Sequence, residues 1–254
     1  MGIFNFLYHA WENSTEKELF FNICQANDLK LDYETNKDSL LILKEIFISR
    51  VYADYFPFYE KVSVMDLGAH KGYFSIFSAK NTHPDSRIIA LEPAEDNFND
   101  LNLNLKANKI ENVEVLKAGV FSETKKTNFY LSKSENHSIF NNYSEYLGTP
   151  PTEPPVEIFV LSLKDLLEKF GINELDFLKV DCEGAEYPFI FSADKQVLAK
   201  IKTISLEFHD LKNKEYTGLK LANHLENNGF KIVKFSYEPT TINNNFGKLI
   251  AVRM

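Results

Sequence analysis

The sequence is poor in cysteine and has no long apolar run. Only Cys24 and Cys182 occur among its 254 residues, which is too few for a disulfide framework and suits a reducing compartment. No uninterrupted apolar stretch approaches the ~18 residues that a membrane-spanning helix needs. The apolar start of the chain has neither a basic segment nor a small-residue cleavage site, unlike a signal peptide. We therefore expect a cytoplasmic protein with no transmembrane segment.

The chain also lacks an excess of basic charge. It has 28 Lys and Arg against 36 Asp and Glu, which gives a formal net charge of −8. Because binding to phosphate backbones depends on clustered Lys and Arg, a nucleic-acid partner is disfavoured. The hydrophobic fraction of 44% is ordinary for a globular protein and argues against wholesale disorder. At about 150 residues per domain, the length fits one large domain or two small ones.

The first sixty residues differ in texture from the rest of the chain. Apolar residues recur at helical spacing between Leu40 and Val51, and Pro57 then interrupts the pattern. We interpret residues 1–60 as an N-terminal helical cap and residues 61–254 as the main domain. The aromatic residues near the start could seal a homodimer or pack against their own domain, and the sequence leaves both open.

From Val62 onward, short apolar runs alternate with helical patterns. Helical patterns include residues 94–107 and 162–170, the second with Ser162 as its expected N-cap. This alternation predicts parallel βαβ units in an α/β fold. Two closing runs, 230–237 and 246–252, predict an antiparallel pair of strands. The other runs typical of strands are 62–67, 87–92, 113–116, 157–161, 176–181 and 203–208.

The alternation is interrupted before residue 157. Residues 127–131 predict an extra strand, and residues 133–155 are polar and then rich in proline. Because the βα pattern resumes afterwards, we interpret 133–155 as an inserted lid rather than a domain linker. Aromatic rings in this lid could cover an acceptor or hold the loop on the body of the protein: Phe140, Tyr143 and Tyr146.

The first candidate site is the segment from Asp66 to Gly72, which follows a strand and opens a helix. Glycine lets the backbone approach a ligand closely, at the edge where open α/β sheets bind ligands. The G-x-x-x-G spacing differs from the G-x-G-x-x-G of dinucleotide sites, and no Walker lysine is present. The pattern disfavours NAD and nucleoside triphosphates, although Gly68 and Gly72 could also be simple turn residues.

Two acidic motifs stand at the ends of other strands. Glu92 lies 92 − 72 = 20 residues past Gly72, where a carboxylate can accept both hydroxyls of a ribose. Together with the glycine loop, it indicates a ribose-bearing ligand, foremost S-adenosylmethionine. Asp181 and Glu183 follow a later core strand, where they could face a sulfonium ion, take a proton, hold a metal or cap a helix.

These motifs resemble the FkbM-type S-adenosylmethionine-dependent methyltransferases. The resemblance lies in residues 64–75, 90–93 and 178–186 and covers roughly residues 43–235. It implies a Rossmann-like class I methyltransferase fold, with a seven-stranded, mostly parallel sheet covered by helices on both faces. It also implies S-adenosylmethionine as the cofactor and O-methylation of a sugar, a glycan or a natural-product hydroxyl as the reaction.

The resemblance also implies roles for individual residues. Glu92 would hold the ribose, and Asp181 would lie near the transferred methyl group. Gly119 and Val120 would neighbour the adenine. The full set of residues expected at the cofactor is Asp66, Gly68, Ala69, His70, Gly72, Phe74, Glu92, Pro93, Gly119, Val120 and Asp181.

The residues around Asp181 include candidates for a general base, which an acceptor hydroxyl usually needs in the absence of a metal. We take Asp181, Glu183 and His209 as the candidate catalytic residues, with His137 of the insertion as an alternative base. A divalent cation could gather on these groups together with Glu207, but no ligand spacing is diagnostic, so we predict no metal site.

Two other classes of protein compete with an enzyme of this kind. One is a catalytically silent binding or accessory protein that keeps the fold. The other is an NAD-linked oxidoreductase, which the missing G-x-G-x-x-G opposes. The acceptor is expected to be a small molecule or a glycan.

Overall fold

The computed structural model describes residues 15–131, 137–140, 154–210, 214–239 and 245–254. Its centre is a seven-stranded sheet in the order β3-β2-β1-β7-β8-β10-β9. The first five strands are mutually parallel, and β10 runs antiparallel to both β8 and β9. The bounds are β1 (Ser63–Leu67), β2 (Arg87–Leu91), β3 (Val113–Leu116), β7 (Leu175–Val180), β8 (Ile201–Asp210), β9 (Phe230–Pro239) and β10 (Asn245–Arg253).

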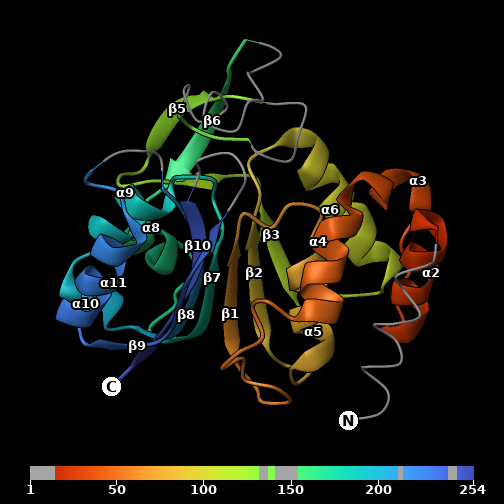
Figure 1. Ribbon diagram of the computed structural model, residues 1–254, viewed down its shortest axis with the longest axis horizontal. Helices are drawn as coiled ribbons and strands as arrows, with labels where there is room; N and C mark the ends of the chain where they lie inside the picture. Colours follow the sequence, from red (N-terminus) through yellow and green to blue (C-terminus); the bar gives the residue numbers. More distant parts are fainter. Residues whose placement is uncertain (1–14, 132–136, 141–153, 211–213, 240–244) are drawn as a thin grey trace.

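Helices cover both faces of this sheet, as the resemblance noted in the sequence leads one to expect (Figure 1). Both faces can pack against helices because successive side chains of a strand point to opposite faces of the sheet. In β2, Ile88 and Ala90 join one buried cluster, whereas Ile89 and Leu91 join the other. The helices after the first strand are α5 (Tyr73–Asn81), α6 (Glu95–Ala107), α8 (Leu163–Lys169), α9 (Glu186–Phe191), α10 (Lys195–Leu198) and α11 (Gly218–Asn227).

The described part of the predicted cap is helical and shares a core with the main domain. Phe20 and Phe47 belong to the same buried cluster as Phe74 and Phe177 of the main domain. The last turn of the cap is π-helical and ends at Arg50, which has a φ of 51°. The elements are α2 (Glu16–Ala26), α3 (Tyr33–Asn36), η1 (Lys37–Ser39), α4 (Leu40–Lys44) and η2 (Glu45–Ser49). The domain boundary at residue 60 stays a prediction.

A second sheet of three strands, in the order β4-β6-β5, lies at the carboxyl end of the main strands (Figure 1). Its members are β4 (Gly119–Val120), β5 (Lys125–Phe129) and β6 (Val156–Leu161). The extra strand expected at 127–131 therefore begins two residues earlier and pairs with β6. Phe129, Ile158 and Val160 form a small separate core with Ala94.

Only part of the predicted lid lies within the described residues. Ser138 pairs with Tyr130, and its hydroxyl donates to the carbonyl oxygen of Glu183 at 2.7 Å. The ring of Phe140 packs edge-on against Phe121, with 6.4 Å between centroids. This segment therefore reaches the acidic motif after β7. Tyr143 and Tyr146 lie outside the described residues.

The membrane prediction can be checked on the same elements. Within the described part of the chain, no helix combines the length and the apolar character that crossing a membrane requires.

Candidate functional site

A cavity of about 270 Å³ opens at the carboxyl ends of the central strands and beneath the small sheet. Open α/β sheets bind their ligands at this edge. Three of the predicted residues, Asp66, Gly72 and His209, are not among the described residues that line the cavity. The predicted residues that the lining brings together are Gly68, Ala69, His70, Phe74, Glu92, Pro93, Gly119, Val120, Asp181 and Glu183.

The loop after β1 is fixed by its backbone. The N–H groups of Gly68 and Ala69 both donate to the carbonyl oxygen of Leu91, at 3.1 and 2.8 Å. Gly68 has a φ of +73°, and a Cβ on it would overlap the carbonyl oxygen of Asp181. Glycine is therefore required at position 68 both by its backbone conformation and by the close approach of the loop after β7.

Glu92 is almost completely buried at the end of β2, with 5% of its surface exposed. Its Oε2 accepts the N–H of His70 at 2.8 Å, and its Oε1 accepts the N–H of Ala94 at 2.9 Å. Burial raises the pKa of Glu92 to about 7 against the opposing effect of these two donors. Because each carboxylate oxygen has two lone pairs, both can accept one further hydrogen bond.

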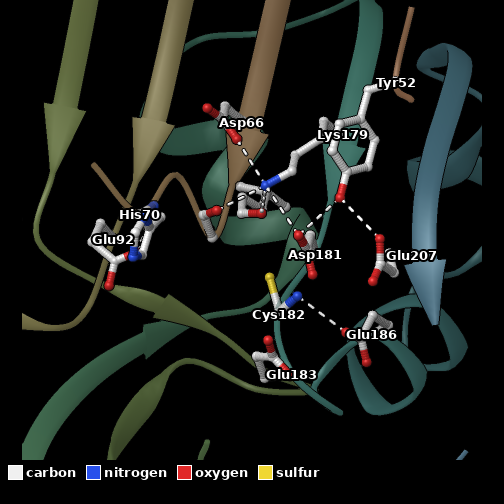
Figure 2. A network of polar contacts seen from close by, with 12 residues as sticks. Tyr52, Asp66, His70, Glu92, Lys179, Asp181, Cys182, Glu183, Glu186 and Glu207 are labelled. Carbon is white, nitrogen blue, oxygen red and sulfur yellow. Dashed lines mark hydrogen bonds and ion pairs between the residues drawn. The ribbon is translucent and has the colours of Figure 1, made fainter. Parts of the chain in front are cut away.

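Lys179 is a buried cation that joins the loops after β1 and β7. Its Nζ lies 3.2 Å from Oδ1 of Asp66 and 3.8 Å from Oδ2 of Asp181, and it donates to the carbonyl oxygen of Gly68 at 2.7 Å (Figure 2). Ser75 donates to the other oxygen of Asp66 at 2.7 Å. Burial alone would lower the pKa of Lys179, but Asp66 and Asp181 outweigh it and hold the pKa above its usual value.

Sequence reasoning assigned no role to Lys179, although a signal was present. It is a lysine inside β7, an otherwise largely apolar strand. A buried lysine is rare unless a carboxylate pairs with it.

Tyr52, which follows the cap helix, was not predicted at all. Its hydroxyl lies 2.9 Å from Oδ2 of Asp181 and 3.2 Å from Oε2 of Glu207 (Figure 2). Burial and then the charge of Asp181 raise the pKa of Glu207 to about 7. A tyrosine after a helix carries no signal that distinguishes this position from a core position, so only the fold reveals it.

His209 occupies a different electrostatic position from the one expected of a base. Its Nδ1 lies 2.9 Å from Oε1 of Glu186, and its Nε2 lies 3.6 Å from Glu183 and 3.7 Å from Glu207. Burial opposes a charged imidazole, but Glu183 and Glu186 outweigh burial and raise the pKa of His209 well above its usual value. A protonated imidazole cannot accept a proton, so His209 would first have to lose one; its role as the general base stays a prediction.

The same group is the best candidate for a cation site among the described residues. Ligand atoms of Asp181, Glu186 and His209 lie within 4.8 Å of one another. The Cys182 N–H also donates to Oε1 of Glu186, at 3.0 Å.

The remaining candidates, His70, His137 and Glu183, also line the cavity. His137 lines it beside the ring of Phe129, at 6.1 Å between centroids, and burial lowers the pKa of this imidazole. His70 and Glu183 both have a φ of 51°. Left-handed backbone at a non-glycine residue costs on the order of 1–3 kcal/mol, and both positions lie in loops that line the cavity.

Residues 66–232 match the family model of the methyltransferase FkbM domain. The chain belongs to this family. The FkbM family consists of S-adenosylmethionine-dependent methyltransferases, so this FkbM chain is an enzyme of the methyl-transferring class, EC 2.1.1.

Relatives of this FkbM methyltransferase include fungal proteins. Methyltransferase 1 of Beauveria bassiana is 28% identical over 212 residues, which cover 75% of this chain and 80% of the relative. Methyltransferase sdnD of Sordaria araneosa is 25% identical over 195 residues, covering 67% and 74% of the two chains. Among solved structures, precorrin-6y C5,15-methyltransferase from Geobacter metallireducens matches with a TM-score of 0.49 and 16% identity, covering 82% of this chain and 88% of that one.

The FkbM family model covers only some of the residues of the site. Asp66, Glu92, Asp181 and Glu207 lie inside residues 66–232, whereas Tyr52 lies before them. The hydroxyl that connects Asp181 with Glu207 therefore comes from a part of the chain that the family model does not describe.

Proposed function

We propose that this FkbM chain binds S-adenosylmethionine in the cavity and transfers its methyl group to a hydroxyl of a small acceptor that carries no negative charge, such as a sugar or a natural product. The observation that carries the proposal is the ring of carboxyl groups beside the glycine loop. The lining contains five acidic side chains, Glu45, Glu92, Asp181, Glu183 and Glu207, against Lys179 as its only lysine or arginine among the described residues. Such a surface favours the sulfonium and ammonium groups of the cofactor and disfavours an acceptor that adds a phosphate or a carboxylate.

The cofactor end of the cavity comprises Gly68, Ala69, Glu92, Gly119 and Val120. Both oxygens of Glu92 already accept a backbone N–H, which fixes the carboxylate in one orientation. We assign their remaining lone pairs to the two ribose hydroxyls. The adenine would lie among the apolar side chains that the small sheet contributes, Phe129 and Ile158.

The acceptor end comprises Leu41, Ile42, Tyr52, Glu207 and Phe246, which line the other part of the cavity. Aliphatic side chains of α4 lie there together with the carboxyl of Glu207. Leu41 is 65% exposed, so this side of the cavity is open to solvent. An apolar wall next to a carboxyl group suits an uncharged acceptor with a hydroxyl at its edge.

The methyl transfer mainly requires that the cofactor and the acceptor be positioned correctly, because the methyl group of a sulfonium is already activated. The loop after β1 and the carboxyl of Glu92 would orient the cofactor. The carboxyl groups at the ends of β7 and β8 would stabilise the positive charge before transfer and receive the proton of the acceptor.

Calorimetric titration with S-adenosylhomocysteine tests the cofactor proposal. We expect micromolar binding to the unaltered protein and a loss of about 100-fold or more in Glu92→Ala, because two hydrogen bonds to a charged group disappear. Glu95→Ala is the matched control, since Glu95 lies three residues away with an exposed side chain that pairs with Lys117, and it should bind as the unaltered protein does.

Two results would contradict this proposal. Absence of binding by the folded, unaltered protein would refute the cofactor site, and equal binding by Glu92→Ala would refute its ribose role. Titration with NAD should give no heat, and heat from NAD would restore the oxidoreductase alternative.

A further inference from the structure

The hydroxyl of Tyr52 stands between two carboxyl groups and has only one hydrogen to give. It lies 2.9 Å from Asp181 and 3.2 Å from Glu207, and the phenol is 5% exposed. If both carboxyls were ionised, one of them would face a lone pair of the phenol oxygen. That contact becomes a hydrogen bond when one of the carboxyls is protonated and donates to the phenol. The geometry therefore favours one extra proton held by the Asp181–Tyr52–Glu207 group.

The charges around the two carboxyls indicate which of them carries this proton. Asp181 lies 3.8 Å from the ammonium of Lys179. Glu207 is 15% exposed, and burial raises its pKa to about 7. The proton therefore lies on Glu207, which donates to the Tyr52 oxygen while the Tyr52 hydroxyl donates to Asp181.

Glu207 is in contact with charged groups of both signs. Lys248 of β10 lies 3.6 Å away, and His209 of the same strand as Glu207 lies 3.7 Å away. These two cations lower its pKa, whereas burial and the charges of Asp181 and Glu45 raise it. The balance places the group where it exchanges a proton near neutral pH, which is the range in which a general base works best.

Other groups at this edge are less suited to remove a proton. His209 is held as an imidazolium by Glu183 and Glu186. Glu186 is fully buried and lies outside the described lining of the cavity. Asp181 is already engaged by a lysine and a phenol. Glu207 both lines the cavity and releases its proton near neutrality.

We propose that Glu207 is the general base of the methyl transfer, and that Tyr52 is a positioning residue that shares one proton between Glu207 and Asp181. This inference rests on the proposed function. The proton of the acceptor hydroxyl moves to the Glu207 carboxylate as the acceptor oxygen bonds to the methyl carbon. The carbon–sulfur bond breaks with its electron pair remaining on sulfur, which leaves neutral S-adenosylhomocysteine and a methyl ether.

The first test detects the shared proton without any acceptor. Infrared difference spectra of the S-adenosylhomocysteine complex between pH 5 and 9 should contain a carboxylic-acid band that disappears with a midpoint at about 7. Glu207→Gln should weaken this band. In Tyr52→Phe the midpoint should fall by about one pH unit, because protonated Glu207 then loses the phenol oxygen to which it donates. Because Glu92 also has a pKa of about 7, part of the band can remain in Glu207→Gln, but a band as strong as that of the unaltered protein would overturn the proposal.

The second test follows S-adenosylhomocysteine formation with a panel of methyl glycosides as acceptors. Below pH 7 the rate should fall about tenfold per pH unit, as expected for a base that must be deprotonated. Glu207→Gln should lower kcat by about 10²- to 10⁴-fold with unchanged S-adenosylhomocysteine affinity. Tyr52→Phe should move the acid limb of the profile to lower pH, in step with the infrared midpoint.

Matched controls separate this proposal from its rivals. Glu168→Gln and Tyr59→Phe change an exposed carboxyl and an exposed phenol, at 59% and 79% exposure, and should leave both measurements unchanged. If Glu183→Gln rather than Glu207→Gln removes the acid limb, the base is Glu183 and the proposal is wrong. Failure of the unaltered protein to bind S-adenosylhomocysteine would instead refute the underlying function, and infrared spectra of the free protein would still report on the shared proton.

Discussion

The cofactor end and the acceptor end of the cavity are built in different ways. At the cofactor end, a hydrogen bond from the backbone N–H of His70 to the side chain of Glu92 spans 22 residues and connects the ends of adjacent parallel strands. At the acceptor end, Tyr52 reaches Asp181 and Glu207 across 129 and 155 residues through side chains alone. The first arrangement follows from local chain geometry, whereas the second exists only after the cap and the strands that carry its partners have packed together.

The largest effect on stability is expected at Gly68, where the loop after β1 contacts the loop after β7. Gly68→Ala would place a Cβ onto the carbonyl oxygen of Asp181 in a left-handed conformation. Because neither backbone can withdraw, we expect a loss of more than about 4 kcal/mol in the free energy of unfolding. Urea denaturation measures it.

Gly171→Ala is the control for the backbone conformation alone. Gly171 has a φ of +63°, and no atom lies within 4 Å of the place that an added Cβ would take, so the cost should be about 1–2 kcal/mol. Equal losses in the two variants would show that the loops after β1 and β7 do not constrain each other.

The next effect tests the cation that connects the two loops. Lys179→Met leaves Asp66 buried without its counterion, and we expect a destabilisation of about 3–5 kcal/mol by urea denaturation. Adding Asp66→Asn should restore part of this loss. Lys202→Met removes two ion pairs from a half-exposed lysine of β8, and it should cost under about 1 kcal/mol. A similar cost for both lysines would contradict the role assigned to Lys179.

The smallest effect on the fold should come from the acceptor end. Leu41→Ala should leave stability within about 0.5 kcal/mol, because the side chain is 65% exposed. It should leave S-adenosylhomocysteine affinity unchanged and raise the KM of a methyl glycoside about tenfold. Leu103→Ala, at 60% exposure on α6, should alter none of these values. Weakened cofactor binding in Leu41→Ala would mean that the two ends are not separate.

The contrast also explains what the sequence could predict. The parallel strands follow from alternating apolar runs, and the loop from Gly68 to Gly72 and the position of Glu92 follow from spacings within a single βαβ unit. Strand-end residues such as Asp181 could be placed at the same edge because parallel strands end together. The separate sheet formed by β4, β5 and β6 was not predicted, because short strands give no information about which sheet they join.

The protonation states and the contact from the cap could not be predicted in the same way. His209 is a candidate base from its ordinary pKa, but three carboxyl groups from two neighbouring segments surround it and raise that pKa. Such a shift depends on distances between side chains, which a single sequence does not contain. Tyr52 is the clearest case, since its partners are set entirely by tertiary packing.

The long reach of Tyr52 has a consequence for synthesis of the chain. Tyr52 is synthesised early, whereas Glu207 follows 155 residues later in the chain. A nascent chain stalled between residues 92 and 181 already has the glycine loop and Glu92, but neither carboxyl partner of Tyr52. Until β8 has emerged, the phenol lacks at least one of its final hydrogen-bond partners, and the centre that handles the proton is completed late in translation.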